Sequence, residues 1–350
     1  MTALSRVSRL SRAVVLDGPG QHRLVVGPAR EPGADEARVA VSAAGICGSD
    51  REVYDGARPA GYVRYPVTPG HEWSGTVEAV GPGVDPALVG RKVVGEGFRN
   101  CRTCDRCRAG DTSLCTAGYS ETGFTEPGGF ADTLVLPARL LHPLRADADL
   151  RAAALLEPAA VAASAALMGN ALPGERVAVV GAGTLGLLAV QLLAAASPSE
   201  LVVVDPRTAR AEQALTMGAT RIHTPADDRL PSGFDLVVET AGAQGSAAAS
   251  ALMARRGGRV VLVGLPAPGA RGIDPIHLAM SQITVHSVFG APSAAWTHAV
   301  RAFDAGLLDP APLITHAFPL EEYATAVALV GGGDASVGKV LLEPGGSTGA

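Results

Sequence analysis

The chain has 350 residues, of which 47% are hydrophobic and 18% charged, so it can bury a sizeable core and does not have a disordered composition. This length exceeds what one hydrophobic core usually holds, so two domains are expected. The net charge of -5 and the lack of a basic block argue against a nucleic-acid partner. No apolar run reaches the roughly 18 residues of a membrane span. The N-terminal "MTALSRVSRLSR" lacks the pattern of a signal peptide, which favours a cytoplasmic protein.

Short apolar stretches broken by Gly and Pro make up the first part of the chain. This pattern predicts antiparallel strands at residues 14–16, 24–26, 38–41, 74–80, 92–95 and 131–136. The β-rich part extends to about residue 155, where an Ala- and Leu-rich helical pattern begins. Strands and helices then alternate, which is typical of a parallel sheet. We predict strands at 176–180, 201–204, 236–238, 259–263 and 339–342, and helices at 184–196, 212–217 and 295–305.

Four of the five cysteines are crowded together with the spacing Cys101-x2-Cys104-x2-Cys107-x7-Cys115. Four thiolates at this spacing can surround a tetrahedral Zn²⁺ at distances of about 2.3 Å. Two disulfides are one alternative, but an odd cysteine count and no export signal argue against an oxidising compartment. An iron–sulfur cluster is another, although the run lacks the Cys-Pro of such sequences. We predict a closed structural zinc site, which has no open position for catalysis.

A glycine-rich turn joins a predicted strand to the helix that follows it. Gly181 allows the tight turn, Gly183 lets a pyrophosphate approach the backbone, and Gly186 lets the helix pack closely on the sheet. Asp205 ends the next strand, where a carboxylate accepts hydrogen bonds from both ribose hydroxyls. The carboxylate repels a 2′-phosphate and so favours NAD, whereas Arg207 leaves NADP possible. The predicted cofactor-binding residues are Gly181, Gly183, Thr184, Leu185, Gly186, Asp205, Arg207 and Arg210.

Three separate segments carry side chains that suit an open metal site. Cys47 lies in "GICGSD", His71 and Glu72 lie in "PGHEWSG", and Glu157 lies in "LEPAAV". A catalytic zinc takes three protein ligands of these kinds and leaves one position for substrate or water. Taken singly, a lone cysteine is usually a core residue and a His-Glu pair usually a solvated turn. The glycines near Cys47 and the Pro-Gly before His71 instead indicate loops that bring these side chains in.

From about Ala13 to Leu342 the chain resembles the zinc-dependent medium-chain dehydrogenases. The shared motifs are, in order, "GICGSD", "PGHEWSGTVEAVG", the four-cysteine loop, "GGFAD", "GAGTLG" and "GGRVVLVG". The resemblance is to the polyol and threonine dehydrogenase branch, because "GEG" precedes the cysteine loop and Glu157-Pro158 stands where liver-type alcohol dehydrogenases have a cysteine ligand. "PGHEWSGTV" and "LVGRKVVGE" are also similar to 2-deoxy-scyllo-inosamine dehydrogenases of aminocyclitol antibiotic biosynthesis.

The resemblance implies an α/β protein with two domains and an active site in the cleft between them. The first is a GroES-like β-rich catalytic domain, residues 1–158, with the structural zinc loop at about 95–116. The second is a Rossmann NAD-binding domain with a doubly wound parallel sheet, residues 159–293. Residues 294–350 would return to the catalytic domain.

The resemblance also implies roles for individual residues. Cys47, His71 and Glu157 become ligands of a catalytic zinc, with Glu72 a ligand or an exchanging neighbour. Ser49 matches the hydroxyl that passes the proton of the alcohol outward. Glu52 stands where many relatives end this relay with a histidine, and it is the candidate for that role here. Because of this and similar departures, the resemblance does not extend to sorbitol or threonine as the substrate.

The implied reaction interconverts a polar secondary alcohol, of polyol, cyclitol, aminocyclitol or amino-alcohol type, and its ketone. It uses NAD and two zinc ions per chain, in a homodimer or homotetramer. A threonine 3-dehydrogenase and a simple secondary alcohol dehydrogenase are the nearest alternatives. A zinc-free enoyl or quinone reductase, or a non-catalytic protein of the same fold, would have no use for the open-site ligands. Metal analysis separates these classes, since only the dehydrogenase holds a second zinc.

Overall fold

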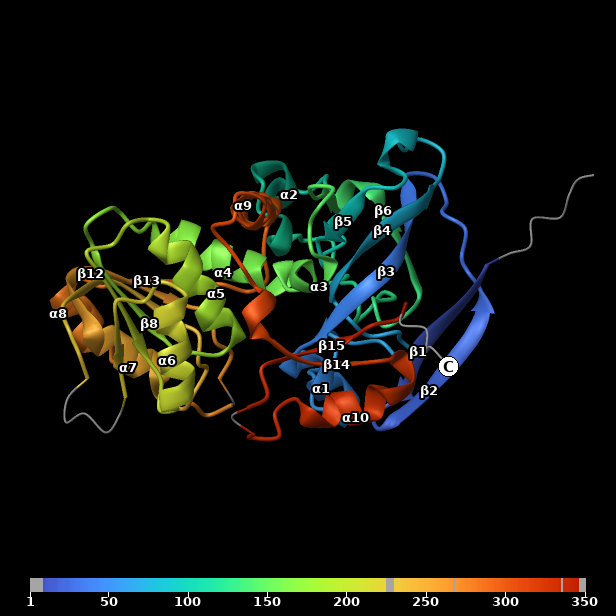
Figure 1. Ribbon diagram of the computed structural model, residues 1–350. Helices are drawn as coiled ribbons and strands as arrows, with labels where there is room; N and C mark the ends of the chain where they lie inside the picture. The colour runs from blue at the N-terminus through green and yellow to red at the C-terminus, as the bar shows by residue number, and fades with distance from the viewer. Residues whose placement is uncertain (1–8, 225–229, 267, 335, 346–350) are drawn as a thin grey trace, which may run out of the picture. The chain divides into compact units, whose positions relative to one another are not determined.

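The computed structural model describes residues 9–224, 230–266, 268–334 and 336–345. The chain folds as two compact units (Figure 1), the first comprising Met1–Glu157 and Ala311–Ala350 and the second Pro158–Pro310. The boundary expected from the sequence puts the return of the chain at residue 294. In the structure the return comes at Ala311, because helix α9 (Ser293–Asp304) packs within the second unit. No helix in the described part of the chain is long and apolar enough to cross a membrane.

The first unit is built around a mostly antiparallel seven-stranded sheet with the order β14-β15-β3-β4-β5-β7, in which β6 also pairs with β3. Its strands are β3 (Glu36–Ile46), β4 (Glu72–Val80), β5 (Lys92–Gly95), β6 (Thr133–Pro137), β7 (Leu141–Pro143), β14 (Ile314–Phe318) and β15 (Lys339–Leu342). Strands β1 (Leu10–Gly18) and β2 (Gln21–Pro28) form a separate antiparallel pair. The helices of this unit are α1 (Gly48–Asp55), α2 (Asp105–Ala109), α3 (Leu150–Ala153) and α10 (Tyr323–Leu329).

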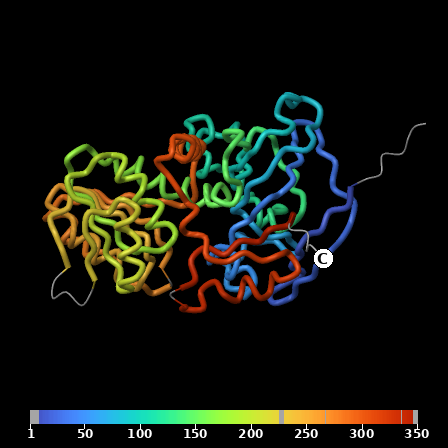
Figure 2. Tube along the Cα trace, viewed as in Figure 1, coloured from blue at the N-terminus to red at the C-terminus, as the bar shows by residue number. Residues whose placement is uncertain are grey.

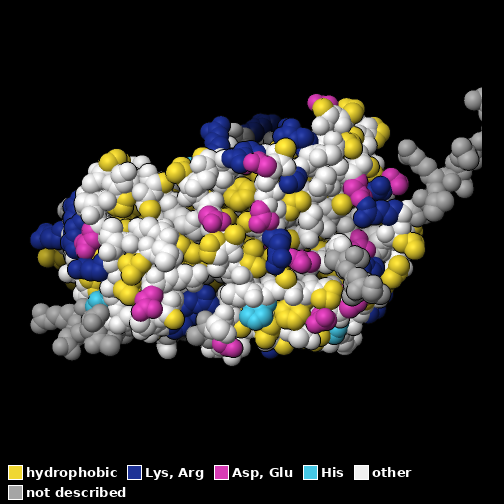
Figure 3. Space-filling model, viewed as in Figure 1, with side chains coloured by type: hydrophobic (Ala, Val, Ile, Leu, Met, Phe, Trp, Pro, Cys, Tyr) yellow, Lys and Arg dark blue, Asp and Glu magenta, His cyan; other side chains and the backbone are white. Residues whose placement is uncertain are grey.

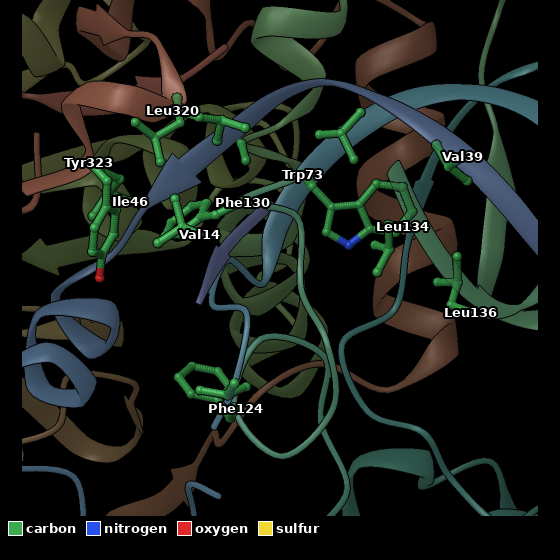
Figure 4. Close-up of a cluster of buried hydrophobic side chains, with 14 of the residues drawn as sticks. Val14, Val39, Ile46, Trp73, Phe124, Phe130, Leu134, Leu136, Leu320 and Tyr323 are labelled. Atoms are coloured by element: carbon green, nitrogen blue, oxygen red, sulfur yellow. The ribbon is translucent and has the colours of Figure 1, made fainter. Parts of the chain in front are cut away.

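Strand β3 carries the core of the first unit. Its residues alternate between buried and half-buried at first and are all buried over the last four positions. This is the pattern of a strand that begins at the surface and ends beneath other elements. Figure 4 shows Val39 of β3, Trp73 of β4 and Leu136 of β6 among the buried side chains of this core. The end of β3 therefore brings the half-buried Cys47, which follows it, to the edge of this core.

The C-terminal segment completes this sheet. Strand β15 pairs antiparallel with β3, with Val340 opposite Ile46, and β14 pairs parallel with β15. Figure 2 shows this red segment running beside the blue part of the trace. Leu320 and Tyr323, which come just after β14, are fully buried in the core of the first unit. Residues from the two ends of the chain thus share one sheet and one core.

The second unit holds a six-stranded parallel sheet with the order β10-β9-β8-β11-β12-β13. Its strands are β8 (Arg176–Val180), β9 (Glu200–Val204), β10 (Arg221–His223), β11 (Phe234–Glu239), β12 (Ala254–Leu262) and β13 (Thr284–Ser287). The other helices are α4 (Leu156–Gly169), α5 (Thr184–Ala194), α6 (Thr208–Thr216), α7 (Ser246–Met253) and α8 (Pro275–Ser281). This is the strand order of the dinucleotide-binding Rossmann fold, with its switch point beside β8. The predicted Rossmann sheet is confirmed.

Charged side chains are distributed over the surface. On the face shown in Figure 3, Lys and Arg lie in several separate groups with Asp and Glu between them. Many of these charges are paired, as in Arg23–Asp17 and Arg30–Glu36. This distribution agrees with a net charge of -5 spread over the whole chain.

Candidate metal centres and dinucleotide site

Cys47 lies where β3 ends and α1 begins. It is the N-cap residue of α1: the Asp50 backbone N–H donates to its side chain, and the Asp50 carboxylate accepts from the Cys47 N–H at 2.8 Å. This reciprocal capping box satisfies two N–H groups at the helix start and holds the thiol in place. The positive end of the helix dipole also favours a negative sulfur here. Where the sequence indicated a loop, the structure therefore has a helix N-terminus.

Cys47, His71 and Glu72 form the first metal-binding candidate, because one ligand atom of each lies within 4.8 Å of those of the other two. Ser49 Oγ lies 3.5 Å from His71 Nε2. The other ring nitrogen, Nδ1, lies 3.5 Å from Asp50 Oδ1. A carboxylate beside the far ring nitrogen is the usual partner of a metal-binding histidine, since it orients the ring and selects its tautomer.

The electrostatics of His71 fit a bound cation. Burial lowers the pKa of His71, but Asp50, Cys47 and Glu157 raise it by more, so that this pKa lies well above its usual value. The same negative groups that favour a proton on the imidazole favour a divalent cation at this place. A thiolate, an imidazole and a carboxylate are ordinary ligands of Zn²⁺. The donor set therefore fits zinc.

Glu157 lies on the first turn of α4. It is not one of the three described residues whose ligand atoms lie within 4.8 Å of one another, although its charge acts on His71. Burial raises the pKa of Glu157 to about 7, and the lowering effects of His71 and Lys339 only partly offset this. A nearby metal cation would favour the charged carboxylate. Its place in the ligand set stays a prediction.

Glu72 takes part in a buried ion pair that the sequence did not predict. Lys339 Nζ, at the start of β15, lies 2.7 Å from both carboxylate oxygens of Glu72. Lys339 is 5% exposed and Glu72 is 0% exposed. Burial lowers the pKa of Lys339, but Glu72 and Cys47 raise it by more, so its pKa lies above the usual value and the amine is charged.

The two residues of the predicted proton relay differ in their surroundings. Ser49 lies beside His71, as described above, and is half-buried. Glu52 lies further along α1 with its side chain 52% exposed, and its carboxylate is 3.7 Å from Arg58 Nη1. No hydrogen bond joins the Glu52 side chain to Ser49 or His71 among the residues that the structure describes. The relay role of Glu52 stays a prediction.

A group of polar side chains adjoins the first metal-binding candidate, and we name Arg58, Tyr119 and Glu121 the polar wall. Arg58 Nη2 donates to Tyr119 Oη at 2.9 Å, and Tyr119 donates to Glu121. The guanidinium of Arg58 lies 3.7 Å above the centre of the Phe124 ring, which is itself 4.7 Å from the centre of the His71 ring. Burial raises the pKa of Glu121, and the lowering effects of His71, Tyr119 and Arg58 are smaller.

The four-cysteine loop forms the second metal-binding candidate. The Sγ atoms of Cys101, Cys104, Cys107 and Cys115 all lie within 4.8 Å of one another. The Cys101–Cys107 separation of 4.0 Å is close to the about 3.8 Å between sulfurs of a tetrahedral zinc site. Helix α2 begins directly after Cys104, and Gly110, with φ 93°, ends it in the left-handed conformation, which turns the chain toward Cys115. All five cysteines of the chain are free.

Backbone N–H groups of this loop point at the sulfurs. The N–H groups of Thr103 and Cys104 donate to Cys101 Sγ at 3.5 and 3.4 Å, and that of Cys107 donates to Cys104 Sγ at 3.4 Å. Hydrogen bonds from Thr103 lower the pKa of Cys101 to about 5, and those from Thr116 and Cys107 lower the pKa of Cys104 to about 7. Such donors stabilise the thiolate, which is the form that binds metal. The loop therefore fits a structural zinc.

The glycine-rich turn after β8 has the geometry that a pyrophosphate site needs. Gly181 has φ +100°, and a Cβ on it would lie 2.9 Å from the backbone of Ala241. A Cβ on Gly186 would lie 1.8 Å from the Gly181 oxygen, so only glycine lets α5 begin so close to the strand. At Gly183 nothing lies within 4 Å of the Cβ position, which leaves room for a phosphate. Thr184 and Leu185 follow in the first turn of α5.

Asp205 follows β9 and is already fully hydrogen-bonded. Its Oδ2 accepts from the Ala182 N–H at 2.7 Å and from Arg207 Nη2 at 2.9 Å. Its Oδ1 accepts from the backbone N and the Nε of Arg207 at 2.8 and 2.9 Å. Burial raises the pKa of Asp205, but these hydrogen bonds lower it by more, so the pKa lies below its usual value. Arg210 lies on α6, where burial and then Arg207 lower its pKa.

Sequence reasoning missed the neighbours of the predicted metal ligands. Asp50 had a signal, because it stands three residues after Cys47, at the spacing of a capping box. Lys339 had only a weak sequence signal: it is one of two lysines in the chain and the first residue of an otherwise apolar strand. Nothing in the sequence around Glu121 sets it apart, since its position beside His71 depends on how the loop packs.

The chain matches two family models: "Alcohol dehydrogenase GroES-like domain" over residues 33–146 and "Zinc-binding dehydrogenase" over residues 184–305. An L-threonine 3-dehydrogenase of Anaeromyxobacter sp. (strain Fw109-5) is 33% identical over 330 residues, which are 90% of this chain and 94% of that protein. Among solved structures, a zinc-binding dehydrogenase of Sinorhizobium meliloti 1021 bound to NADP has a TM-score of 0.89 at 28% identity, covering 96% of this chain and 100% of that one. Galactitol-1-phosphate dehydrogenase of Escherichia coli has a TM-score of 0.84 at 28% identity, with 95% and 100% covered.

Proposed function

This chain belongs to the zinc-binding dehydrogenase family, and we propose that it interconverts a polar secondary alcohol and its ketone with NAD as hydride acceptor. The observation that carries the proposal is the convergence of Cys47, His71 and Glu72 within 4.8 Å. A non-catalytic protein, or a reductase without zinc, would not need these three side chains together beside a hydroxyl such as that of Ser49.

The two cofactors supply the reactive chemistry, and the chain supplies their surroundings. Zn²⁺ bound by Cys47, His71 and Glu157 supplies a Lewis acid that lowers the pKa of an alcohol. NAD bound at the glycine-rich turn supplies the hydride acceptor. A second Zn²⁺ in the four-cysteine loop has no open position and holds the loop together.

Ser49 is the residue that we assign to proton transfer. Its hydroxyl lies 3.5 Å from His71 Nε2 and can accept the proton of an alcohol placed there. Asp50 holds His71 from the other side, which keeps the ring in one orientation while the proton moves. We propose that Glu52 receives this proton through water, because its carboxylate lies on the same helix and is exposed to solvent.

The polar wall favours a polar substrate. Glu121 accepts from Tyr119 through Oε2, and none of the described residues donates to its Oε1. A carboxylate oxygen with this vacancy can accept from a hydroxyl or ammonium group of a substrate. This favours polyols, cyclitols, aminocyclitols and amino alcohols over simple alcohols. Threonine is a second candidate, because the curated relative that is 33% identical is an L-threonine 3-dehydrogenase.

For the cofactor we propose NAD, with NADP as an alternative. Asp205 follows β9, the position at which a carboxylate accepts from the ribose hydroxyls in Rossmann domains, and its own hydrogen bonds hold its pKa below the usual value. Arg207 supports the alternative, since its guanidinium lies on this carboxylate and is 49% exposed. The relative from Sinorhizobium meliloti was solved with NADP.

We also propose that the protein is a homodimer or homotetramer that uses the open edge of the second sheet. Strand β13 ends the strand order and has one neighbour, β12, in the described residues. An open edge presents unpaired N–H and C=O groups, and Ile276 and Met280 are 71% and 70% exposed on α8, the helix before β13. Light scattering should give a mass of at least two chains, and Met280→Lys should weaken the association. A reducing compartment such as the cytoplasm suits both sites, because they need free thiolates.

The experiment that tests the function measures NADH formation with a panel of alcohols. The panel contains one polyol, one cyclitol, one aminocyclitol, L-threonine and one simple secondary alcohol, each tried with NAD and NADP. We expect turnover with a polar alcohol and about two zinc ions per chain. A single zinc per chain together with no reduction of either cofactor would refute the assignment.

A further inference from the structure

We propose that Lys339 is a positioning residue that keeps Glu72 off the catalytic metal, so that the metal retains an open position. The metal would then have three protein ligands, Cys47, His71 and Glu157. This inference rests on the proposed function, because it requires a metal at this site. It concerns the only lysine of the chain other than Lys92.

Three neighbouring strands bring the two side chains together. Gly45 of β3 lies opposite Glu72 of β4 and opposite Leu341 of β15. Residues directly opposite one another share a face of the sheet, and so do residues two apart along a strand. Lys339, two residues before Leu341, therefore has its side chain on the same face as Glu72. Gly45 lies between the two strands and leaves room for the ion pair, because it has no side chain. A Cβ at this position would lie 2.1 Å from Glu72 Oε2.

The contacts of the ammonium group are complete. Lys339 Nζ lies 2.7 Å from each oxygen of Glu72 and 3.4 Å from the carbonyl oxygen of Ile46. An ammonium group has three N–H donors, and three acceptors surround this one. Both oxygens of Glu72 accept from Lys339, and each keeps a second lone pair, so the pair restrains the position of the carboxylate rather than blocking its oxygens.

The charges around the metal explain why such a pair is useful. Cys47, Glu72 and Glu157 would bring three negative charges to one divalent cation, in addition to the Asp50 carboxylate beside His71, and Lys339 offsets one of these charges. Stability alone does not account for a buried ion pair, because the cost of desolvation offsets much of the attraction. An open coordination position requires that no fourth protein ligand reaches the metal. Holding Glu72 by its two oxygens meets that requirement.

Lys339→Met tests the proposal, because it removes the ammonium and keeps an unbranched chain. Glu72 is then left unpaired beside the metal, and we expect it to become the fourth protein ligand. Zinc should leave the holoenzyme for a chelator about tenfold more slowly than in the wild type, whereas losing an ordinary supporting contact weakens metal binding by about 10–100-fold. In the cobalt-substituted enzyme, the visible spectrum should change and should no longer respond to added imidazole, a ligand that needs an open position.

Three further variants complete the test. The double variant Lys339→Met with Glu72→Gln removes the freed carboxylate and should return zinc release and the cobalt spectrum to those of the wild type. Lys339→Arg keeps the positive charge, and its planar guanidinium can donate two parallel hydrogen bonds to a carboxylate. This variant should therefore also behave as the wild type does. Lys92→Met removes the other lysine, whose Nζ donates to the Ala148 carbonyl at 2.7 Å. It should change neither readout. The four-cysteine site is the same in all variants, so differences between their spectra come from the catalytic site.

Faster zinc release from Lys339→Met would show that Lys339 is an ordinary supporting contact of the metal site. Loss of zinc from the double variant would show that Glu72 is a ligand in the wild type. Either result would overturn the proposal. If Lys339→Met does not fold, the double variant and Lys339→Arg decide by the same two measurements. Failure of this proposal leaves the dehydrogenase assignment intact, because the wild type still reduces NAD. Failure of the proposed function shows itself differently, as a wild type without a second zinc.

Discussion

The carboxylate of Asp205 is held on both oxygens by the side chain of Arg207, with Nε–Oδ1 and Nη2–Oδ2 distances of 2.9 Å. Asp205 is the group that should accept from the cofactor ribose, and its acceptor positions are already filled. The ribose hydroxyls of NAD can bind Asp205 only if they displace the Arg207 side chain from its carboxylate. The 2′-phosphate of NADP can instead pair with the guanidinium of Arg207. We therefore expect the choice between NAD and NADP to depend on these two residues together.

Arg207→Ala should shift the preference of the enzyme toward NAD. The variant frees Asp205 to accept from the ribose, and it removes the positive partner of a 2′-phosphate. We expect NADPH binding to weaken by about tenfold or more, which corresponds to one lost charged hydrogen bond, and NADH binding to become tighter. Fluorescence titration measures both dissociation constants. Arg255→Ala is the matched control, because Arg255 is 51% exposed and pairs with Asp235 in the same unit. Unchanged NADPH affinity in Arg207→Ala would contradict this prediction.

Asp50→Asn should weaken the catalytic metal site without unfolding the protein. The amide can still accept from the Cys47 N–H, but the negative charge beside His71 is lost. Replacing such a partner of a metal-binding histidine typically costs about 10–100-fold in metal affinity or activity. The rate of zinc transfer to a chelator measures the effect. Asp55→Asn, on the same helix but paired with Arg51 at the surface, should behave as the wild type. Equal zinc release from both variants would count against the role of Asp50.

Cys104→Ser should remove one zinc per chain and lower the thermal stability. Cys104 is the N-cap residue of α2, and its Sγ accepts from the Cys107 N–H, so the variant disturbs both the metal site and the helix start. Each kcal/mol of lost stability lowers the Tm by about 2–4 °C in a domain of this size. Zinc analysis and thermal melting test the prediction. Full zinc content with an unchanged Tm would show that the loop does not hold a structural metal.

Cys47→Ser and His71→Ala should abolish turnover while leaving NADH binding almost unchanged. Both residues belong to the first unit, whereas Asp205 and the glycine-rich turn belong to the second. Zinc content should fall by about one ion per chain, and NADH titration should give the dissociation constant of the wild type. Loss of NADH binding in both variants would mean that the two sites depend on each other.

Glu121→Gln should reduce activity on polar alcohols more than on a simple secondary alcohol. The amide keeps the size of the side chain, but it loses the charge that attracts an ammonium group and one of its two acceptor oxygens. We expect kcat/KM for an amino alcohol to fall by about tenfold, with little change for the simple alcohol. Glu126→Gln is the control, because that carboxylate pairs with Arg64 near the surface. An equal loss on both substrates would assign Glu121 to stability rather than to recognition.

The sequence by itself determined the features whose parts lie close along the chain. The four cysteines fall within fifteen residues, so their convergence needs only local turns such as that at Gly110. The glycine-rich turn is local for the same reason: Gly181 has the positive φ of the tight turn and Gly186 the close helix packing that their spacing predicts. Alternating and continuous apolar stretches likewise indicated the strands, because burial on one or both faces follows from side-chain direction.

Only the tertiary structure decided which distant residues meet. Lys339 reaches Glu72, 267 positions away in sequence, because β15 and β4 both pair with β3 and Gly45 leaves a gap between them. Glu121 lies near His71 because the turn after it packs against the backbone of Gly70 and His71. A Cβ on Gly123, in this turn, would lie 2.9 Å from the backbone nitrogen of His71. A sequence pattern records which face of its own strand or helix a residue occupies. It holds no information on strand order across a sheet, and strand order is what places Lys339 beside Glu72.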